Sequence, residues 1–250
     1  DPQQVANTIW AYATLGRVLP QDVAAALDTA VLRESWRLNP QNVANTLWAY
    51  ATLDTAPPQD VAAALDTAVL REAGRLNPQN VANTMWAYAT LGSPLSQDVS
   101  AALDTAVLRK AGRMNPQNVA NTLWAYATFD DAPPQDVATV LDTAVLRNSR
   151  RLNPQEVANT LWAYAALINA PPPEVFDALH ASVLQAAGRM NPQNVANMLW
   201  AYATLGRALP PDVAAALDAA VLREARHLIP RDVANAMWAY AALGRAPPQD

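Results

Sequence analysis

Hydrophobic residues recur along this chain at helical spacing, in short segments that proline residues separate. In one segment Val43, Leu47 and Ala51 lie four residues apart, which predicts an amphipathic helix from Pro40 to about Leu53. The Asn before this proline suits the N-cap of a helix, and proline suits its first position. We call this predicted element helix A.

A second predicted element, helix B, follows the break at Asp54–Pro58. Its apolar stripe consists of Val61, Leu65, Ala68 and Val69. Asp60 lies in its first turn and Arg71 and Arg75 lie near its end, so these charges complement the helix dipole. We expect helix B to run for about eighteen residues and, because the links are short, to lie antiparallel to helix A.

The pair of helices repeats every 38 residues. A tryptophan marks the same place in each copy: Trp10, Trp48, Trp86, Trp124, Trp162, Trp200 and Trp238. A fixed period of this size indicates a repeat array, in which each unit buries its apolar face against its neighbours. The pattern predicts an all-α fold, an α-solenoid with a right-handed superhelix, in which helix A and helix B form separate layers.

Six full repeats and a partial seventh fill the chain as a single array. The predicted units are residues 1–38, 39–76, 77–114, 115–152, 153–190, 191–228 and 229–250. Because the last unit lacks its helix B, we expect the array to be part of a longer one. The copies are similar enough to suggest either recent duplication or deliberate consensus design.

Composition excludes several classes of function. The chain has no cysteine, so it forms neither disulfides nor thiolate metal sites, and we expect no cofactor and no metal. No stretch reaches about 18 consecutive apolar residues, which excludes a membrane-spanning helix. The net charge of −5 disfavours a nucleic-acid binder unless the charges are segregated.

The aromatic residues of helix A allow more than one interpretation. We expect Trp48 and its equivalents to lie in the core, wedged between successive repeats, with stacking on a nucleobase as the alternative. We expect Tyr50 and its equivalents in the core or at its edge, with the hydroxyl meeting a neighbour.

Helix A also carries an amide-rich stripe formed by Asn42, Asn45, Thr46 and Ala49, with almost no charge. Amides offer the donors and acceptors that base edges require, whereas a solvent-facing helix usually carries Lys and Glu. Asn45 and its equivalents never vary, so a structural amide ladder between repeats is their alternative role. The residue at the position of Asn42 varies, but only among polar types, which is expected both of a modular base code and of an unconstrained surface position. The predicted base-contacting residues are Gln4, Asn7, Asn42, Asn45, Thr46, Asn80, Asn83, Thr84, Asn118, Asn121, Thr122, Glu156, Asn159, Thr160, Asn194, Asn197, Asp232 and Asn235.

Arginines form two rows before helix A, while acids such as Asp22 and Asp28 lie in helix B, where we expect a solvated outer face. The predicted phosphate contacts are Arg37, Arg75, Arg113, Arg151 and Arg189. The second row contains Arg33, Arg71, Arg109, Arg147 and Arg223. The first row would guide a phosphate backbone past the N-termini of helix A, or it would only complement the ends of helix B.

Enzymatic function is not expected. The two histidines, His180 and His227, lie in different repeats, and the sequence has neither a Gly-rich phosphate loop nor a His–carboxylate metal cluster. We expect His180 to be a surface variant at a position of repeated Thr or Ala. The pair Asp130–Asp131 is expected in a turn.

The whole chain resembles the octotricopeptide repeat (OPR) family. The resemblance rests on the 38-residue period, on the helix A sequence Asn-Val-Ala-Asn-Thr-Leu-Trp-Ala-Tyr-Ala-Thr-Leu, and on Pro171–Val175, which is similar to a Pro-Pro-Pro-Glu-Trp motif. Val replaces the Trp of that motif in every copy. The resemblance implies a helical-pair solenoid that binds single-stranded RNA at approximately one nucleotide per repeat, in a chloroplast or mitochondrion, and acts in RNA stability, splicing or translation.

Two functions from different classes follow. The first is sequence-selective binding of single-stranded RNA, with Glu156 and Asp232 marking different base preferences. The second is a protein- or peptide-binding scaffold, which the acidic composition favours. We expect no small-molecule substrate and no membrane partner. The uncapped apolar residues Val233, Met237 and Ala241 are expected to fray or to mediate self-association.

Overall fold

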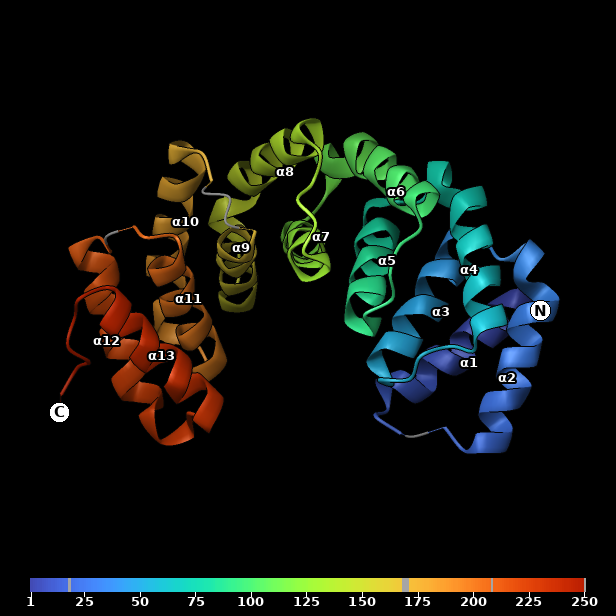
Figure 1. The fold of residues 1–250 in the computed structure, drawn as a ribbon, viewed down its shortest axis with the longest axis horizontal. Coiled ribbons are helices and arrows are strands. Elements are labelled where there is room, and N and C mark those ends of the chain that lie inside the picture. Colours follow the sequence, from blue (N-terminus) through green and yellow to red (C-terminus); the bar gives the residue numbers. More distant parts are fainter. Residues whose placement is uncertain (18, 168–170, 208, 250) are drawn as a thin grey trace. The chain divides into compact units, whose positions relative to one another are not determined.

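The computed structural model describes residues 1–17, 19–167, 171–207 and 209–249, so Asp250, the end of the last predicted unit, lies outside the described residues. Within these ranges the chain forms helices and no strands (Figure 1). The helices follow one another as regular helix hairpins, and the chain is an all-α solenoid, as the sequence predicts. The right-handed superhelix stays a prediction.

Both helices of the predicted hairpin are present in the repeats. Helix A corresponds to α1 (Pro2–Thr14), α3 (Pro40–Thr52), α5 (Pro78–Leu91), α7 (Pro116–Phe129), α9 (Pro154–Ala166), α11 (Pro192–Thr204) and α13 (Pro230–Ala242). Helix B corresponds to α2 (Gln21–Glu34), α4 (Gln59–Glu72), α6 (Gln97–Lys110), α8 (Gln135–Asn148), α10 (Pro173–Ala186) and α12 (Pro211–Glu224). A 3-10 turn follows each helix B: η1 (Ser35–Arg37), η2 (Ala73–Arg75), η3 (Ala111–Arg113), η4 (Ser149–Arg151), η5 (Ala187–Arg189) and η6 (Ala225–His227).

Helix A begins with a reciprocal cap. The Asn39 side chain accepts a hydrogen bond from the Asn42 backbone N–H at 2.9 Å, and the Asn42 side chain accepts one from the Asn39 backbone N–H at 3.3 Å. This capping box satisfies two donors that a helix N-terminus leaves without partners. The same pair forms at the start of α5, α7, α9 and α11. Asn42 and its equivalents in α5, α7, α9 and α11 are therefore part of the helix cap.

Left-handed residues end several A helices. Gly92 follows α5 with a φ of 60°, and Asp130 follows α7 with a φ of 54°. Glycine adopts this conformation without steric cost, and Asp tolerates it better than most residues. The prediction that Asp130–Asp131 belongs to a turn is confirmed.

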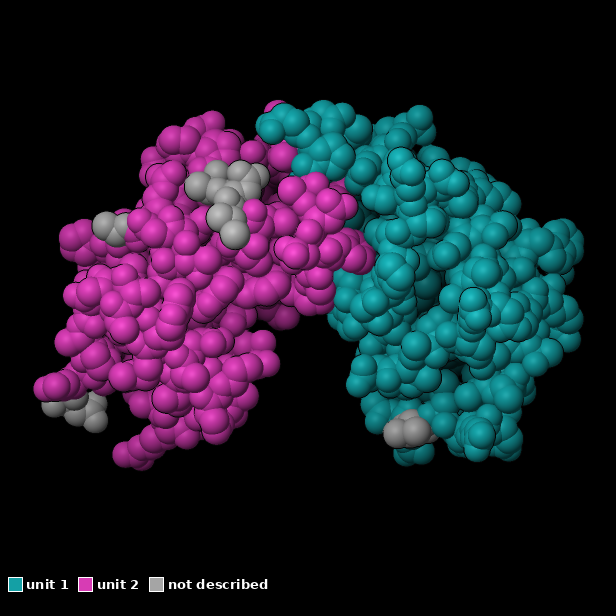
Figure 2. All heavy atoms as spheres, viewed as in Figure 1, with its two compact units in different colours: residues 1–114, 133–137 teal, residues 115–132, 138–250 magenta. Residues whose placement is uncertain are grey.

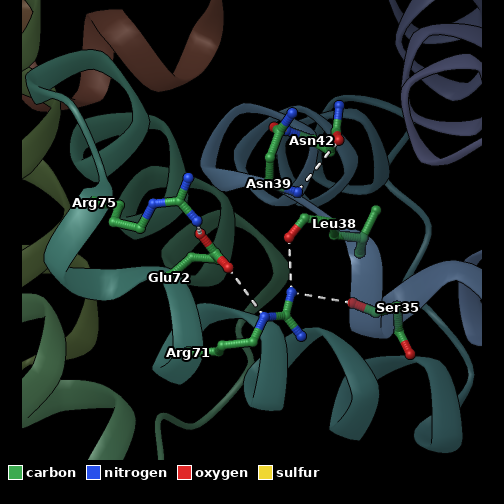
Figure 3. A network of polar contacts seen from close by, with 7 residues as sticks. All are labelled: Ser35, Leu38, Asn39, Asn42, Arg71, Glu72 and Arg75. Carbon is green, nitrogen blue, oxygen red and sulfur yellow. Dashed lines mark hydrogen bonds and ion pairs between the residues drawn. The ribbon is translucent and has the colours of Figure 1, made fainter.

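Helix B is shorter than predicted. In the second repeat the α-helix ends at Glu72, and Ala73–Arg75 form a tighter 3-10 turn. Because the chain must change direction before the proline that opens the next A helix, the last turn tightens to bonds three residues apart. The Glu72 side chain is buried beneath this turn and accepts hydrogen bonds from Arg71 Nε at 3.0 Å and Arg75 Nη1 at 2.9 Å (Figure 3).

The chain divides into two compact units (Figure 2): residues 1–114 with 133–137, and residues 115–132 with 138–250. In the first unit α1, α3 and α5 lie side by side in one layer, and α2, α4 and α6 form the other. In the second unit α7, α9, α11 and α13 occupy one layer, and α10 and α12 lie in the other. The predicted core residues of the second repeat are all buried: Val43, Leu47, Ala51, Val61, Leu65, Ala68 and Val69.

Tyrosine–aspartate hydrogen bonds tie α3, α5, α9 and α13 each to the preceding helix B. The Tyr50 hydroxyl donates to Asp28 Oδ1 at 2.5 Å, and the Tyr88 hydroxyl donates to Asp66 Oδ1 at 2.6 Å. Matching bonds join Tyr164 to Asp142 and Tyr240 to Asp218. Burial, with a smaller contribution from the aspartate, raises the pKa of these tyrosines above its ordinary value. The expected meeting of the tyrosine hydroxyl with a neighbour is confirmed, and this aspartate row is not simply a solvated face.

The fifth repeat lacks this tie. His180 stands where the other repeats carry Asp28 and its equivalents, so the expectation of a surface variant at a Thr or Ala position is wrong. The rings of His180 and Tyr202 lie 5.5 Å apart, and Phe176 packs edge-on against both. Among the described residues neither His180 Nε2 nor the Tyr202 hydroxyl, both buried, has a hydrogen-bond partner. Burial lowers the pKa of His180.

Candidate functional site

One face of helix A stays accessible. In α3 it consists of Gln41, Asn45, Trp48 and Thr52, and all of these are exposed or half-buried. We call this set and its equivalents the amide–tryptophan stripe. The equivalents in the other A helices are Gln3, Asn7, Trp10 and Thr14; Gln79, Asn83, Trp86 and Thr90; Gln117, Asn121, Trp124 and Thr128; Gln155, Asn159 and Trp162; Gln193, Asn197, Trp200 and Thr204; and Arg231, Asn235 and Trp238.

The predicted stripe was displaced by one residue around the helix. Asn42 is 4% exposed, Thr46 is fully buried, and Ala49 lies beside them in the interface between neighbouring A helices. The prediction of direct base contact is therefore corrected at these two polar positions, because their side chains are buried. The residues concerned are Asn42, Thr46, Asn80, Thr84, Asn118, Thr122, Thr160, Asn194 and Asp232. The physical reason is that Asn42 is polar because it caps its helix, and that Thr46 is small enough to pack in the interface.

Other predicted base contacts do lie at the surface. Asn45, Asn83, Asn121, Asn159, Asn197 and Asn235 are half-buried within the stripe, and Gln4, Asn7 and Glu156 are also accessible. Gln4 belongs to the face that is buried in later A helices, and it is exposed because no described helix packs there on α1. The Gln41 row was missed, although a glutamine at this position in six of the seven repeats was a visible signal.

The tryptophans connect neighbouring repeats but are not fully buried. The rings of Trp10 and Trp48, and of Trp48 and Trp86, lie 6.4 Å apart at tilts of 36° and 33°. In the second unit the Trp124–Trp162 and Trp162–Trp200 spacings are 6.4 Å and 6.2 Å. The predicted contact between successive repeats is confirmed, whereas the predicted core burial is wrong. Part of each ring remains available to a ligand.

Asparagine recurs at the position of Asn45 in every repeat, but these side chains do not form an amide ladder between repeats. The side chains of Asn45, Asn83, Asn121, Asn159 and Asn197 have no hydrogen-bond partner among the described residues. Each amide therefore keeps its donors and its acceptor for solvent or for a ligand. The amide ladder is therefore not formed among the described residues, and contact of the Asn45 row with a bound molecule stays a prediction.

The two arginine rows have different surroundings. Arg71 Nη2 donates to the backbone oxygens of Leu38 at 2.7 Å and Ser35 at 3.2 Å in the preceding repeat, so Arg71 is a structural tie (Figure 3). Arg223 makes the same contact with Met190. The arginines of the predicted phosphate row are exposed. Arg75 forms an ion pair with Glu72 and Arg37 forms one with Glu34, but more than half of each arginine side chain remains accessible to solvent. Arg113, Arg151 and Arg189 are exposed without an acidic partner among the described residues.

In the part of the chain that the structure describes, no group of His, Cys, Asp or Glu could hold a metal ion. No described helix is long and apolar enough to cross a bilayer. At the end of the chain Val233 and Met237 are 41% and 50% exposed and Ala241 is also exposed, while α13 is helical throughout.

Comparison with known proteins gives a family. Two designed armadillo repeat proteins, one in complex with the peptide (KR)4, align over 94% of this chain and 99% of theirs, with identities of 12% and 15% and TM-scores of 0.29 and 0.26. No curated protein matches the sequence. A family of unknown function (DUF1601) matches residues 29–47. The family model described as "Tbc2 translation factor, N-terminal domain" matches residues 71–132, 114–170 and 174–249. Since these matches together span more than half of the sequence, this helical-repeat chain belongs to the family of the Tbc2 translation factor N-terminal domain.

Proposed function

We propose that this chain is an OPR-type array that binds single-stranded RNA along the amide–tryptophan stripe, at roughly one nucleotide per repeat. The observation that carries the proposal is the stripe itself. Repeat after repeat presents an exposed glutamine, an asparagine amide without an internal partner, and a partly open tryptophan ring in the same register. Membership of the Tbc2 translation factor family supports a role in translation.

The chemistry of the stripe suits unpaired bases. Bases of single-stranded RNA stack on aromatic rings and form hydrogen bonds along their exposed edges. Neighbouring tryptophan rings are only about 6 Å apart and already in contact, so a base would lie across their open faces and not between them. Asn45 and Gln41 lie about one and two turns before Trp48 on the same face of α3, and their amides would then meet the base edges.

The distribution of charge is compatible with a polyanion despite the net charge of −5. The stripe is uncharged from α1 to α11, whereas acids such as Asp66 lie on helix B and are held there by tyrosine. Arg113, Arg151 and Arg189 lie just before the N-termini of A helices and are free to meet phosphate. The RNA backbone would follow this arginine row.

A peptide-binding scaffold is the second candidate. Free amides at regular intervals would also bind an extended peptide backbone, and the acidic composition favours a basic peptide. Salt dependence separates the two candidates. About five arginine–phosphate contacts give a slope of roughly −3 to −4 for log K against log salt, whereas a peptide held by amides gives a much smaller slope.

The experiment is a selection from a randomised single-stranded RNA pool, followed by titration of the recovered RNA at several salt concentrations. We expect a motif of about six or seven nucleotides, in which the repeats with identical stripes select one base repeatedly. No enrichment over background would refute RNA reading. Recovery without a salt slope would refute the arginine row as the phosphate contact.

Paired variants test the stripe. Asn45→Ala with Asn83→Ala should weaken binding of the selected RNA, because both residues lose an amide that the fold does not use. Gln59→Ala is the matched control, since Gln59 is an exposed amide on helix B. Arg113→Gln should reduce the salt slope by about 0.7. Equal effects of the helix A and helix B variants would place the RNA elsewhere.

The setting that we propose is a chloroplast or mitochondrion, where the array would act in RNA stability, processing or translation by binding alone. Any chemical step on the RNA would then come from another domain or protein. Targeting of a fluorescent fusion of the full-length natural protein tests the compartment, and exclusive cytosolic fluorescence would refute it.

A further inference from the structure

The fifth repeat carries a carboxylate where its neighbours carry an amide. Glu156 in α9 occupies the capping position of Asn42, and it makes both bonds of the capping box: its Oε2 accepts from the Asn153 N–H at 2.7 Å, and its own N–H donates to Asn153 Oδ1 at 2.9 Å. Capping thus uses one side-chain oxygen. The other oxygen, Oε1, has no hydrogen-bond partner among the described residues.

Side-chain length decides whether this position reaches the surface. Asn42 and Asn118 are 4% and 5% exposed, and Asp232 is 4% exposed beside Arg231, whose Nε lies 3.7 Å from its carboxylate. Glu156 is one methylene longer than Asp232 and is half-buried, with a hydrogen bond that remains exposed to solvent. The predicted base preference at Asp232 is therefore not supported, whereas Glu156 brings a carboxylate to the edge of the amide–tryptophan stripe.

Glu156 lines a hollow between α7 and α9, two neighbouring helices of the second unit. The hollow has a volume of about 170 Å³, and its walls are mostly polar. Gln117 and Asn121 of α7 face Gln155, Glu156 and Asn159 of α9 across it. It is smaller than the roughly 300 Å³ at which pockets for drug-sized ligands begin, but it can accept the edge of one planar base.

The chemistry of these walls discriminates among the four bases. A carboxylate only accepts hydrogen bonds, and it binds most strongly to two adjacent N–H donors. The Watson–Crick edge of guanine offers such a pair, N1–H beside the N2 amino group. Adenine and cytosine each place a ring nitrogen acceptor next to their amino group, and uracil flanks its single N–H with two carbonyl oxygens, so each of them would set a lone pair against the carboxylate.

We propose that the hollow between α7 and α9 is a guanine site, in which the Glu156 carboxylate accepts from guanine N1–H and N2–H and an amide of Asn121 or Asn159 donates to guanine O6. This inference rests on the proposed RNA binding and adds the identity of one base. The equivalent residue is a buried asparagine in α3, α5, α7 and α11, so those repeats present no such carboxylate.

The test uses the RNA that the full chain selects, with single guanines replaced in turn by inosine, which keeps N1–H and lacks the N2 amino group. At one position we expect inosine to weaken binding about five- to a hundredfold, the range for loss of a good base contact. Glu156→Asn restores the residue of the neighbouring repeats and therefore retains the cap. This variant should bind guanine and inosine RNA equally.

A transplant provides the converse test. Asn194→Glu places the longer side chain at the same position of α11, opposite Gln155 and Asn159 of α9, and should create a second guanine preference one nucleotide away. Failure to select any RNA would refute the proposed function and this site together. Selective RNA binding whose base preference does not change in Glu156→Asn would refute the guanine site alone, and so would a Glu156-dependent preference for another base.

Discussion

Replacing tyrosine by phenylalanine should destabilise the array in one repeat and should not destabilise it in another. The Tyr88 hydroxyl donates to the Asp66 carboxylate at 2.6 Å, which joins α4 to α5. The Tyr202 hydroxyl is equally buried, but His180 stands in place of the aspartate and the hydroxyl has no partner among the described residues. Tyr88→Phe therefore removes a bond, whereas Tyr202→Phe removes only a buried polar group.

The expected magnitudes follow from the charge of the acceptor. A hydrogen bond to a charged group contributes about 1.5–3 kcal/mol, so Tyr88→Phe should destabilise the array by that amount. Burial of an unpaired hydroxyl is unfavourable by about 1–3 kcal/mol, so Tyr202→Phe should leave the free energy of unfolding unchanged or raise it. His180→Asp should restore the bond, and Tyr202→Phe should then become destabilising in that background, which forms a double-mutant cycle.

Urea unfolding followed by circular dichroism gives the global stability. Because repeat arrays often unfold in parts, amide hydrogen exchange in α5 and α11 supplies the local free energies. Equal losses of protection in Tyr88→Phe and Tyr202→Phe would refute the reasoning, since they would mean that the aspartate contributes nothing beyond the packing of the ring. A His180→Asp variant that is no more stable than the parent chain would count against the tie as well.

Four further outcomes are expected. Burial lowers the pKa of His180 from 6.5, so as the pH falls the imidazole binds a proton in the unfolded chain before it does so in the folded chain. The free energy of unfolding should therefore fall as the pH drops through about 6.5, and His180→Gln should flatten that part of a pH–urea profile. Thr84→Val should not lower the unfolding midpoint and should leave RNA affinity unchanged, because the Thr84 hydroxyl is fully buried without a partner; a loss of more than about 1 kcal/mol would contradict this. Arg71→Gln should destabilise the array by about 1.5–3 kcal/mol, and the exposed Arg75→Gln by less than about 1 kcal/mol, with similar losses refuting the assignment of Arg71 as a structural tie. Asp130→Gly should raise the thermal midpoint by relieving a positive φ worth about 1 kcal/mol, and an unchanged or lower midpoint would contradict this.

The array could be predicted from the sequence because its signals are repeated. Apolar spacing, Asn-Pro starts and a fixed period all pointed to the same hairpin, and residues such as Val43 and Leu65 are buried as expected. The 3-10 turn after helix B could not be read in the same way, because Glu72 and Arg71 are typical of a continuing helix. The helix ends where the chain turns toward Pro78, which opens the next A helix, and that change of direction belongs to the tertiary structure.

The candidate site was predicted less well, for a reason that Asn42 illustrates. An asparagine in a helix can form hydrogen bonds with solvent, with a ligand or with its own backbone. Periodicity does not distinguish these three roles. The capping box accounts for Asn42, and tight packing accommodates Thr46, so two polar rows lie inside the array. The interpretation of Trp48 was wrong in the opposite direction, since its size suggested the core although its side chain stays partly exposed.

In helix A the residue that caps the helix, Asn42, is not one of the residues that face a ligand, and this limits how the array could select among bases. The exposed positions of the repeat, those of Gln41, Asn45 and Trp48, are nearly invariant, and identical residues in equal surroundings give every repeat the same base preference. Under the proposed function, the repeats that share this stripe would contribute affinity and a uniform base preference. Discrimination would then concentrate where a side chain departs from the pattern and still reaches the surface, and in the interior of the array Glu156 meets both conditions. Selectivity would therefore depend mainly on the repeat that contains Glu156. An array with a different base-contacting residue in every repeat would not show this dependence.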